Sequence, residues 1–298
     1  MMKKMLAMIL ALVMSLSLVA CGGGEDAPAD DGADAPEVEE AVLKTVTDGV
    51  LTVATSPDFA PYEFYAIDAN GEPQLAGFDM ALAQYIADYL GLTLEVVPMS
   101  FNGIVGEMGA GVADLALAGL SPDPKRENAM DFSDIYYEGK QAFITVSDKA
   151  GLFTDLASTN SAEFSIGAQT GTIQMDLAQQ YSPDADIVTL TKATDIIAEL
   201  VSGKLDGGYV EWDVAVAYQA NYPELTIVCE VPYEAEGNVI GVKKGNADLL
   251  KYVNEALHKC INEGTFAQFV KEANELSSGN TYEGILDPDG KVPTTNEG

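Results

Sequence analysis

The sequence predicts an α/β protein built from two doubly wound units, and three observations lead to this class. Strand and helix patterns alternate over residues 51–118, and the alternation recurs over residues 164–221. A third block, residues 239–275, has one strand and two helices but no further strand partners. It most simply packs back on the first unit, so the chain must cross between the units twice, near 140–145 and near 229–238.

The first unit is predicted to begin with a short buried strand at residues 51–54. A helix is expected over 78–90, because apolar residues recur there on one face and Gly91 supplies a stop signal. The remaining elements of this unit are expected in the order strand 94–97, helix 104–108 and strand 114–118.

The second unit is predicted to have strands near Ile166, Ile187 and Tyr209. The helices between and after these strands are expected at 173–181, 193–202 and 213–221. The third block is expected to have a strand at 239–242 and helices at 247–262 and 265–275. Ligands of such sheets bind beyond the carboxyl ends of the strands, so the cleft between the two units is the expected site.

The N-terminus has the features of an export signal. Lys3 and Lys4 precede an apolar run at 5–14 that is too short to span a bilayer. The stretch closes with Leu-Val-Ala before Cys21, which resembles the cleavage site of bacterial lipoproteins. We therefore expect a signal peptide at 1–20 and an extracytoplasmic protein anchored to the membrane by lipid on Cys21. The alternative is an ordinary signal peptide with an incidental cysteine.

Two segments of the chain lack core-forming residues. Eight carboxylates lie between Glu25 and Glu40, among Gly, Ala and Pro, so residues 21–47 are expected to form a disordered acidic tether. Residues 276–298 are again rich in Gly, Pro and polar residues and are expected to form a C-terminal tail.

Charge and composition exclude several function classes. The 298 residues include 15 Lys or Arg against 47 Asp or Glu, a formal net charge of −32, which would repel nucleic acid. Arg126 is the only arginine and His258 the only histidine, so histidine-rich metal sites and arginine clusters that clamp polyphosphates are also excluded. We expect no cofactor, no metal ion and a monomer.

A set of motifs along residues 48–275 resembles the polar amino-acid-binding proteins of ABC importers, the extracytoplasmic solute-binding family of two-lobed receptors. The motifs are Thr55-Ser56-Pro57-Asp58-Phe59-Ala60-Pro61-Tyr62-Glu63-Phe64, Gly77-Phe78-Asp79, Asp114-Leu115-Ala116-Leu117-Ala118-Gly119, Arg126, Asp131-Phe132-Ser133 with Tyr136-Tyr137, Gly171-Thr172 and Gly264-Thr265-Phe266.

The resemblance implies a type II-like periplasmic-binding-protein fold. Each lobe is then a doubly wound mixed sheet flanked by helices, and the two crossings act as hinges. Lobe 1 is expected at 48–141 plus 236–275, and lobe 2 at 142–235.

The carboxylate of an amino-acid ligand needs a planar, permanently charged donor pair, which arginine provides and lysine does not. Arg126 is the only candidate. The resemblance implies that Arg126 binds this carboxylate with help from the amides of Ser121, Thr172 and Ile173. Asp123 as N-cap and Pro124 at the first helical position are expected to keep the helix start around Arg126 intact.

The resemblance also assigns the ligand's ammonium group. Glu211, directly after a predicted strand, stands where the family more often has Asp, with the carbonyl of Gly119 and the hydroxyl of Ser121 as partners. Asp213 is the fallback, and a solvated carboxylate is the alternative interpretation of Glu211.

The ligand side chain is expected to lie between Phe59 and Phe101, although burial in the core is the alternative for each ring. Ser56 and Gln169 stand at the family positions that contact the side-chain head. Because position 56 carries no acid, a neutral polar amino acid is favoured.

The expected function is a lipid-anchored receptor that binds a free amino acid and delivers it to an ABC importer permease. Two alternatives use the same scaffold. One is an enzyme resembling cyclohexadienyl dehydratase, in which Glu211 or Glu63 would act as general acid. The other is an amino-acid sensor domain. Cys229 and Cys260 could form a disulfide or remain two thiols.

Overall fold

The computed structural model describes residues 43–68, 70–234, 237–279 and 281–282, all within one compact unit, Val42–Gly298. The predicted signal peptide, Cys21, most of the acidic tether and the tail from residue 283 onward lie outside the described residues. Among the residues that are described, no helix is both long enough and apolar enough to cross a membrane.

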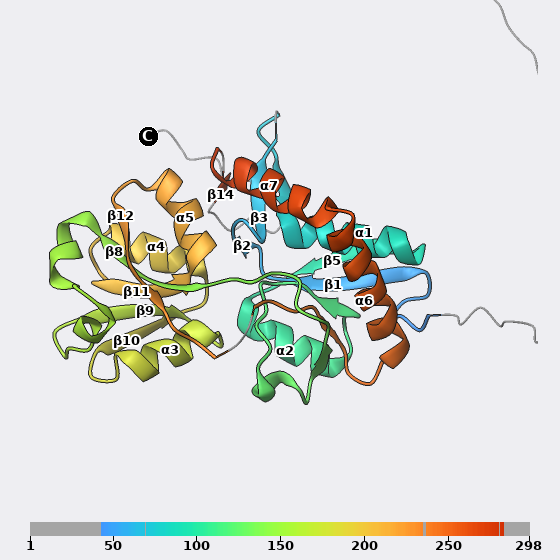
Figure 1. Cartoon of the computed structure of the whole chain (residues 1–298), viewed down its shortest axis with the longest axis horizontal. Coiled ribbons are helices and arrows are strands. Elements are labelled where there is room, and N and C mark those ends of the chain that lie inside the picture. The colour runs from blue at the N-terminus through green and yellow to red at the C-terminus, as the bar shows by residue number, and fades with distance from the viewer. Residues whose placement is uncertain (1–42, 69, 235–236, 280, 283–298) are drawn as a thin grey trace, which may run out of the picture. The chain divides into compact units, whose positions relative to one another are not determined.

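The first lobe contains a five-stranded sheet. Its strand order is β5 (Thr93–Pro98), β1 (Val50–Thr55), β6 (Leu115–Ala116), β13 (Gly241–Lys243) and β7 (Met130–Phe132). Strand β1 pairs in parallel with β5 and β6, whereas β13 is antiparallel to both of its neighbours. Figure 1 shows helices on both sides of this sheet: α1 (Phe78–Leu90), α6 (Ala247–Asn262) and α7 (Thr265–Ser277) on one, and α2 (Phe101–Ala110) on the other.

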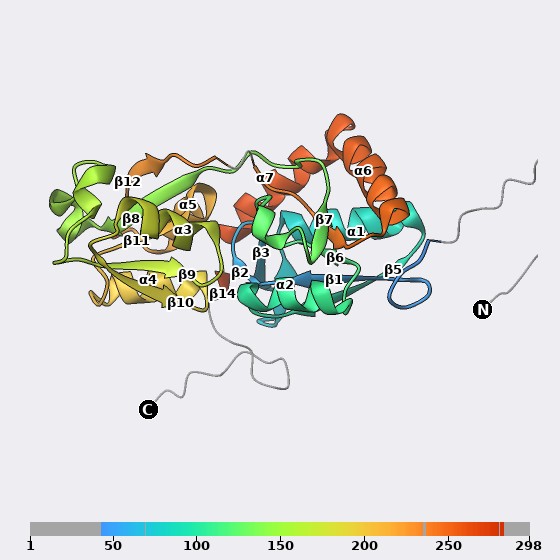
Figure 2. The same ribbon diagram turned by 90° about the horizontal axis from the view of Figure 1, so that it is seen from below.

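The second lobe has the same design. Its sheet has the order β10 (Asp186–Leu190), β9 (Ser165–Gln169), β11 (Gly207–Glu211), β8 (Gln141–Val146) and β12 (Leu225–Val231). Helix α3 (Ile173–Tyr181) lies on one face, and α4 (Ala193–Val201) and α5 (Trp212–Asn221) on the other, as Figure 2 allows the reader to follow. The predicted fold of two mixed α/β lobes is confirmed. Cys229 and Cys260 are free thiols, so they form no disulfide.

Two segments connect the lobes, and they pair with each other. Residues 133–140 run from β7 to β8, and residues 232–234 and 237–240 lie between β12 and β13. They meet at an antiparallel bridge between Tyr137 and Asn238. The first crossing therefore lies before the predicted position at 140–145. The reason is that residues 141–146 already pair with β11 and β12 in the second sheet.

A small third sheet was not predicted. It consists of β2 (Asp58–Phe59), β3 (Glu63–Ile67), β4 (Pro73–Ala76) and β14 (Thr281–Tyr282), with β3 pairing with each of the others. Strand β14 belongs to the stretch expected to be a tail. At the other end of the chain, residues 43–47, expected to close the tether, contact the first lobe: the amide of Val46 donates to Asp114 Oδ1 at 2.7 Å.

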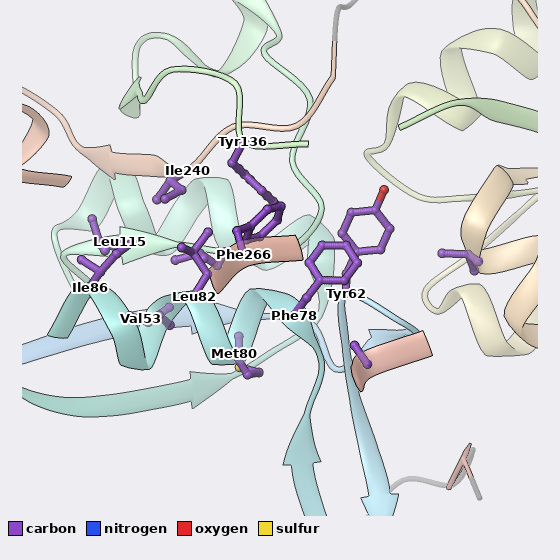
Figure 3. Close-up of a cluster of buried hydrophobic side chains, with 14 of the residues drawn as sticks. Val53, Tyr62, Phe78, Met80, Leu82, Ile86, Leu115, Tyr136, Ile240 and Phe266 are labelled. Carbon is purple, nitrogen blue, oxygen red and sulfur yellow. The ribbon is translucent and has the colours of Figure 1, made fainter. Parts of the chain in front are cut away.

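An aromatic cluster fixes β3 to helix α1 (Figure 3). The fully buried rings of Tyr62 and Phe78 lie 4.4 Å apart between centroids, and the ring of Phe266 packs edge-on against Phe78. Gly77 permits this contact, because a Cβ there would lie 2.0 Å from the carbonyl oxygen of Tyr62, and its φ is +117°. The packing sets the position of Glu63, the next residue along the chain.

Candidate functional site

A small cavity lies where the two lobes meet. Its lining residues come from both lobes: Ser56, Asp58, Phe59, Glu63, Phe101, Ala118, Gly119, Ser121, Arg126, Gln169, Thr172, Ile173 and Gln174. The enclosed space is about 10 Å³, roughly that of one water molecule. A larger ligand can enter only if the lobes separate or the lining side chains move.

Most of the residues singled out from the sequence meet in this cavity. They are Ser56, Phe59, Phe101, Gly119, Ser121, Arg126, Gln169, Thr172 and Ile173. Glu211 is not among the described residues that line it. Sequence reasoning did not select Asp58, Ala118 and Gln174, and it considered Glu63 only for the enzyme alternative.

Arg126 lies at the end of a short 3₁₀ turn, Pro124–Arg126, whose start is formed as predicted: the carboxylate of Asp123 accepts the Lys125 amide, and Pro124 begins the turn. The residue is 4% exposed, and burial lowers the pKa of its guanidinium below the ordinary value. It donates to the carbonyl oxygens of Ser121 at 2.9 Å and Gly171 at 3.2 Å. Its partners are thus main-chain dipoles from both lobes.

The N-terminus of helix α3 faces the same cavity from the second lobe. Thr172 is its N-cap residue, and the Thr172 hydroxyl accepts the amide of Met175 while donating to the carbonyl of Gln169. The first amides of a helix carry partial positive charge and lack intrahelical partners, so they favour an anion. Together with Arg126 they make this end of the cavity electropositive.

Two aromatic rings form walls of the cavity. The guanidinium carbon of Arg126 lies 5.3 Å from the centroid of Phe101, a cation–π contact. Phe59 lies beside Tyr62, with ring centroids 5.2 Å apart. The backbone at Gly119 lies close to the Phe59 ring: a Cβ at this position would be 2.8 Å from the ring, so only glycine fits here.

The polar groups of Gly119 already have partners. Its amide donates to Asp79 Oδ2 at 3.0 Å, and its carbonyl accepts from Asn238 Nδ2 at 2.8 Å. Asn238 belongs to the second crossing, and its side-chain oxygen accepts from the Tyr62 hydroxyl at 3.3 Å. The carbonyl of Gly119 has a second lone pair that can still accept a hydrogen bond from a ligand.

Glu211 lies at the end of strand β11, next to the first crossing. It is the N-cap of helix α5, where Oε2 accepts the Val214 amide at 2.9 Å and Oε1 accepts the Lys140 amide at 3.3 Å. Burial, with a smaller contribution from the charge on Asp213, raises the pKa of Glu211 to about 8. Its carboxyl group lies close to Gly139 of the first crossing, where an added Cβ would be 3.2 Å from Oε1.

Glu63 is the unusual group of the cavity. It is fully buried on β3 opposite Phe59, and it shares a side-chain hydrogen bond with another buried acid, Asp79. Burial, with smaller contributions from Asp79 and Asp58, raises the pKa of Glu63 well above its ordinary value. Its position next to an aromatic cluster in a buried strand is a signal that the sequence did contain, since an acid is rarely placed there without a partner.

The sequence profile of the bacterial extracellular solute-binding proteins, family 3, matches residues 51–273. The chain belongs to this family. Its two sheets, the paired crossings and the interlobe cavity are the architecture of an amino-acid-binding solute-binding protein of ABC transporters.

Three relatives illustrate the similarity. The arginine-binding extracellular protein ArtP of Bacillus subtilis is 26% identical, covering 91% of this chain and 98% of ArtP. An amino acid ABC transporter substrate-binding protein of Streptococcus pneumoniae, solved with L-arginine, is 34% identical with a TM-score of 0.72, covering 76% of this chain and 95% of that chain. Cyclohexadienyl dehydratase of Pseudomonas aeruginosa is 26% identical, covering 77% of this chain and 84% of the dehydratase.

The two lobes of this solute-binding protein are also joined directly by a buried carboxylate. Asp58 of lobe 1 accepts the Ala193 amide of lobe 2 at 2.6 Å and the side-chain amide of Gln169 at 3.2 Å. Helix α4, which begins at Ala193, has no side-chain cap of its own, because its N-cap residue is Lys192. Asp58 therefore caps a helix of the opposite lobe.

Replacing Asp58 by alanine is expected to shift the ligand-free protein toward a more open arrangement of the lobes. The change removes charge-assisted hydrogen bonds worth about 1.5–3 kcal/mol and leaves the Ala193 amide without its partner. Small-angle scattering should show a larger radius of gyration. Lys125→Ala is the matched control: it removes the exposed interlobe ion pair with Asp176, which contributes little. Equal scattering from the Asp58 variant and the parent would contradict the role of Asp58.

Proposed function

We propose that this chain is a lipid-anchored extracytoplasmic receptor that binds a free L-α-amino acid between its lobes and delivers it to an ABC importer permease. The observation that carries the proposal is Arg126. Among the described residues its guanidinium forms no ion pair, although it is almost fully buried. A buried charge without a counter-ion is costly, and a ligand carboxylate would supply the missing anion.

The other groups of the cavity complement the remainder of an amino acid. The amides of Thr172 and Ile173, at the start of α3, would share the carboxylate with Arg126. The carbonyl of Gly119 and the hydroxyl of Ser121 would accept protons from the ammonium group. Glu211 would supply the anion at this end. Its carboxylate now accepts hydrogen bonds from the backbone amides of Lys140, Asp213 and Val214, so it must shift to reach the ligand.

The N-terminal features support the anchored location. A charged start, a short apolar run and small residues before Cys21 fit export followed by lipidation, and the strongly acidic chain would not adhere to a membrane by charge. We propose that the protein acts as a monomer, without cofactor, and binds its ligand without converting it.

A thermal-shift screen of the twenty amino acids tests this proposal, using protein refolded to remove carried-over ligand. A ligand at about a hundred times its dissociation constant adds about 2.7 kcal/mol of stability. For a chain of this size that raises the melting temperature by roughly 5–10 °C. At least one L-amino acid should produce this shift and be recovered unchanged, while its decarboxylated amine should not. No shift with any amino acid, or conversion to a product, would contradict the proposal.

A further inference from the structure

The motif Gly77-Phe78-Asp79 contains a buried acid that the proposed binding chemistry does not use. Asp79 lies in the first turn of α1, is 0% exposed, and is not among the described residues that line the cavity. Its two oxygens contact different segments: Oδ2 accepts the Gly119 amide at 3.0 Å, and Oδ1 accepts the Tyr136 hydroxyl at 2.8 Å. One carboxyl group therefore joins the cavity wall to the first crossing.

Both partners of Asp79 are held by further contacts. Gly119 has a left-handed backbone, with φ +55°, and its carbonyl accepts from the Asn238 side chain of the second crossing at 2.8 Å. The Tyr136 ring packs edge-on against Phe266, with centroids 5.7 Å apart (Figure 3). The Tyr136 amide donates to the Asn238 carbonyl at 2.9 Å. Asp79 thus closes a ring of hydrogen bonds between the cavity wall and the two crossings.

A second buried acid supports this arrangement. Glu63 is also 0% exposed and shares a side-chain hydrogen bond with Asp79, which requires one of the two acids to carry a proton. Asp79 already accepts from two donors and lies at the positive end of a helix, which favours its ionised form. Burial, with smaller contributions from Asp79 and Asp58, raises the pKa of Glu63 well above its ordinary value. Glu63 therefore keeps the proton and donates a hydrogen bond to Asp79.

We infer that Asp79 is a positioning residue for ligand binding: its ionised carboxylate, with a protonated Glu63 beside it, fixes Gly119 in the cavity wall and ties it to the first crossing. The inference rests on the proposed function, because that function gives the Gly119 carbonyl to the ligand's ammonium group. Asp79 acts on the ligand only through Gly119, so loss of its carboxylate displaces a contact that the ligand needs.

Two variants of nearly unchanged shape test the inference by calorimetry at pH 8, with the amino acid found in the thermal-shift screen. Asp79→Asn offers one acceptor oxygen to three donors, so it should weaken binding by about tenfold. Glu63→Gln keeps an N–H donor for Asp79 and should change the affinity by less than about twofold. Asp88→Asn, which changes an exposed acid on the same helix, should have an equally small effect.

A purely structural role of the acid pair gives a different result. Asp79→Asn would then lower the melting temperature of the ligand-free protein without changing the affinity of the folded variant, and this outcome overturns the inference. A loss of affinity in Glu63→Gln but not in Asp79→Asn also overturns it, because Glu63 would then be the ionised acid.

NMR of the wild-type protein gives a test that needs neither ligand nor variant. Burial raises the pKa of Asp79 to about 6, so the Gly119 amide proton should move upfield as the pH falls through this value. Glu63 and Tyr136, which also face Asp79, stay protonated there, since burial raises the pKa of both. A constant Gly119 shift overturns the inference even if Asp79→Asn does not fold. Failure of every amino acid to bind overturns the proposed function, whereas the NMR titration still decides whether the Asp79 carboxylate holds Gly119.

Discussion

Replacing Arg126 by alanine is expected to weaken binding of the amino-acid ligand by about two to three decades. The variant leaves a desolvated carboxylate without its main partner, which costs roughly 2–5 kcal/mol. Arg126→Lys keeps the charge but loses the planar fork, so it should weaken binding by about tenfold or more. Calorimetry with the ligand found in the thermal-shift screen measures both effects.

The neighbouring Lys125 gives the control for this series. Its ammonium group is exposed and pairs with Asp176 at 2.6 Å, so Lys125→Ala should change the affinity by less than about twofold. An Arg126→Lys variant that binds as tightly as the parent would show that Arg126 is not the carboxylate clamp.

Lowering the pH below about 8 is expected to weaken binding of the amino-acid ligand, by at most about tenfold per unit. In the ligand-free protein, burial and, to a smaller extent, the charge on Asp213 raise the pKa of Glu211 to about 8. The ligand's ammonium group favours the carboxylate and lowers that pKa. Between the lower and the higher value, binding must release a proton, so the affinity rises with pH until about pH 8.

Other buried groups contribute less to this pH dependence. Asp79 has its pKa raised to about 6 by burial, so it adds a second proton only near the acidic end of the range. The Tyr136 hydroxyl, which donates to Asp79, has its pKa raised well above the ordinary value and stays protonated. Arg126 stays charged throughout.

Calorimetry in two buffers of different ionisation enthalpy counts the protons released. The ligand should release up to about one proton near pH 7, whereas the Glu211→Gln variant should release almost none. An affinity that stays constant from pH 6 to pH 8 would show that Glu211 does not exchange a proton for the ligand's ammonium group.

Local patterns in the sequence were sufficient for much of the fold. Helix 78–90 was predicted with both ends correct, because its apolar face and Gly91 are local signals, and Gly91 does adopt the left-handed conformation at the C-cap. Strands β8 and β12 were assigned to crossings, because only pairing with β11 and with each other, across long sequence separations, shows that they belong to the second sheet.

The site was partly predictable for a similar reason. Arg126 could be chosen from chemistry alone, since the chain has one arginine. Asp58 could not, because its role arises where β2 meets the second lobe at Ala193, more than a hundred residues away. For Glu211, the sequence placed an acid at the end of a strand, but the same position begins α5. The helix's free amides therefore compete with a ligand for its carboxylate.

A crystal structure of the refolded protein grown with the amino acid found in the thermal-shift screen tests the central claim most directly. The ligand should lie in the cavity between the lobes, with its carboxylate within hydrogen-bonding distance of the Arg126 guanidinium and of the first amides of helix α3. A ligand bound outside this cavity, or with its carboxylate directed away from Arg126, would contradict the claim.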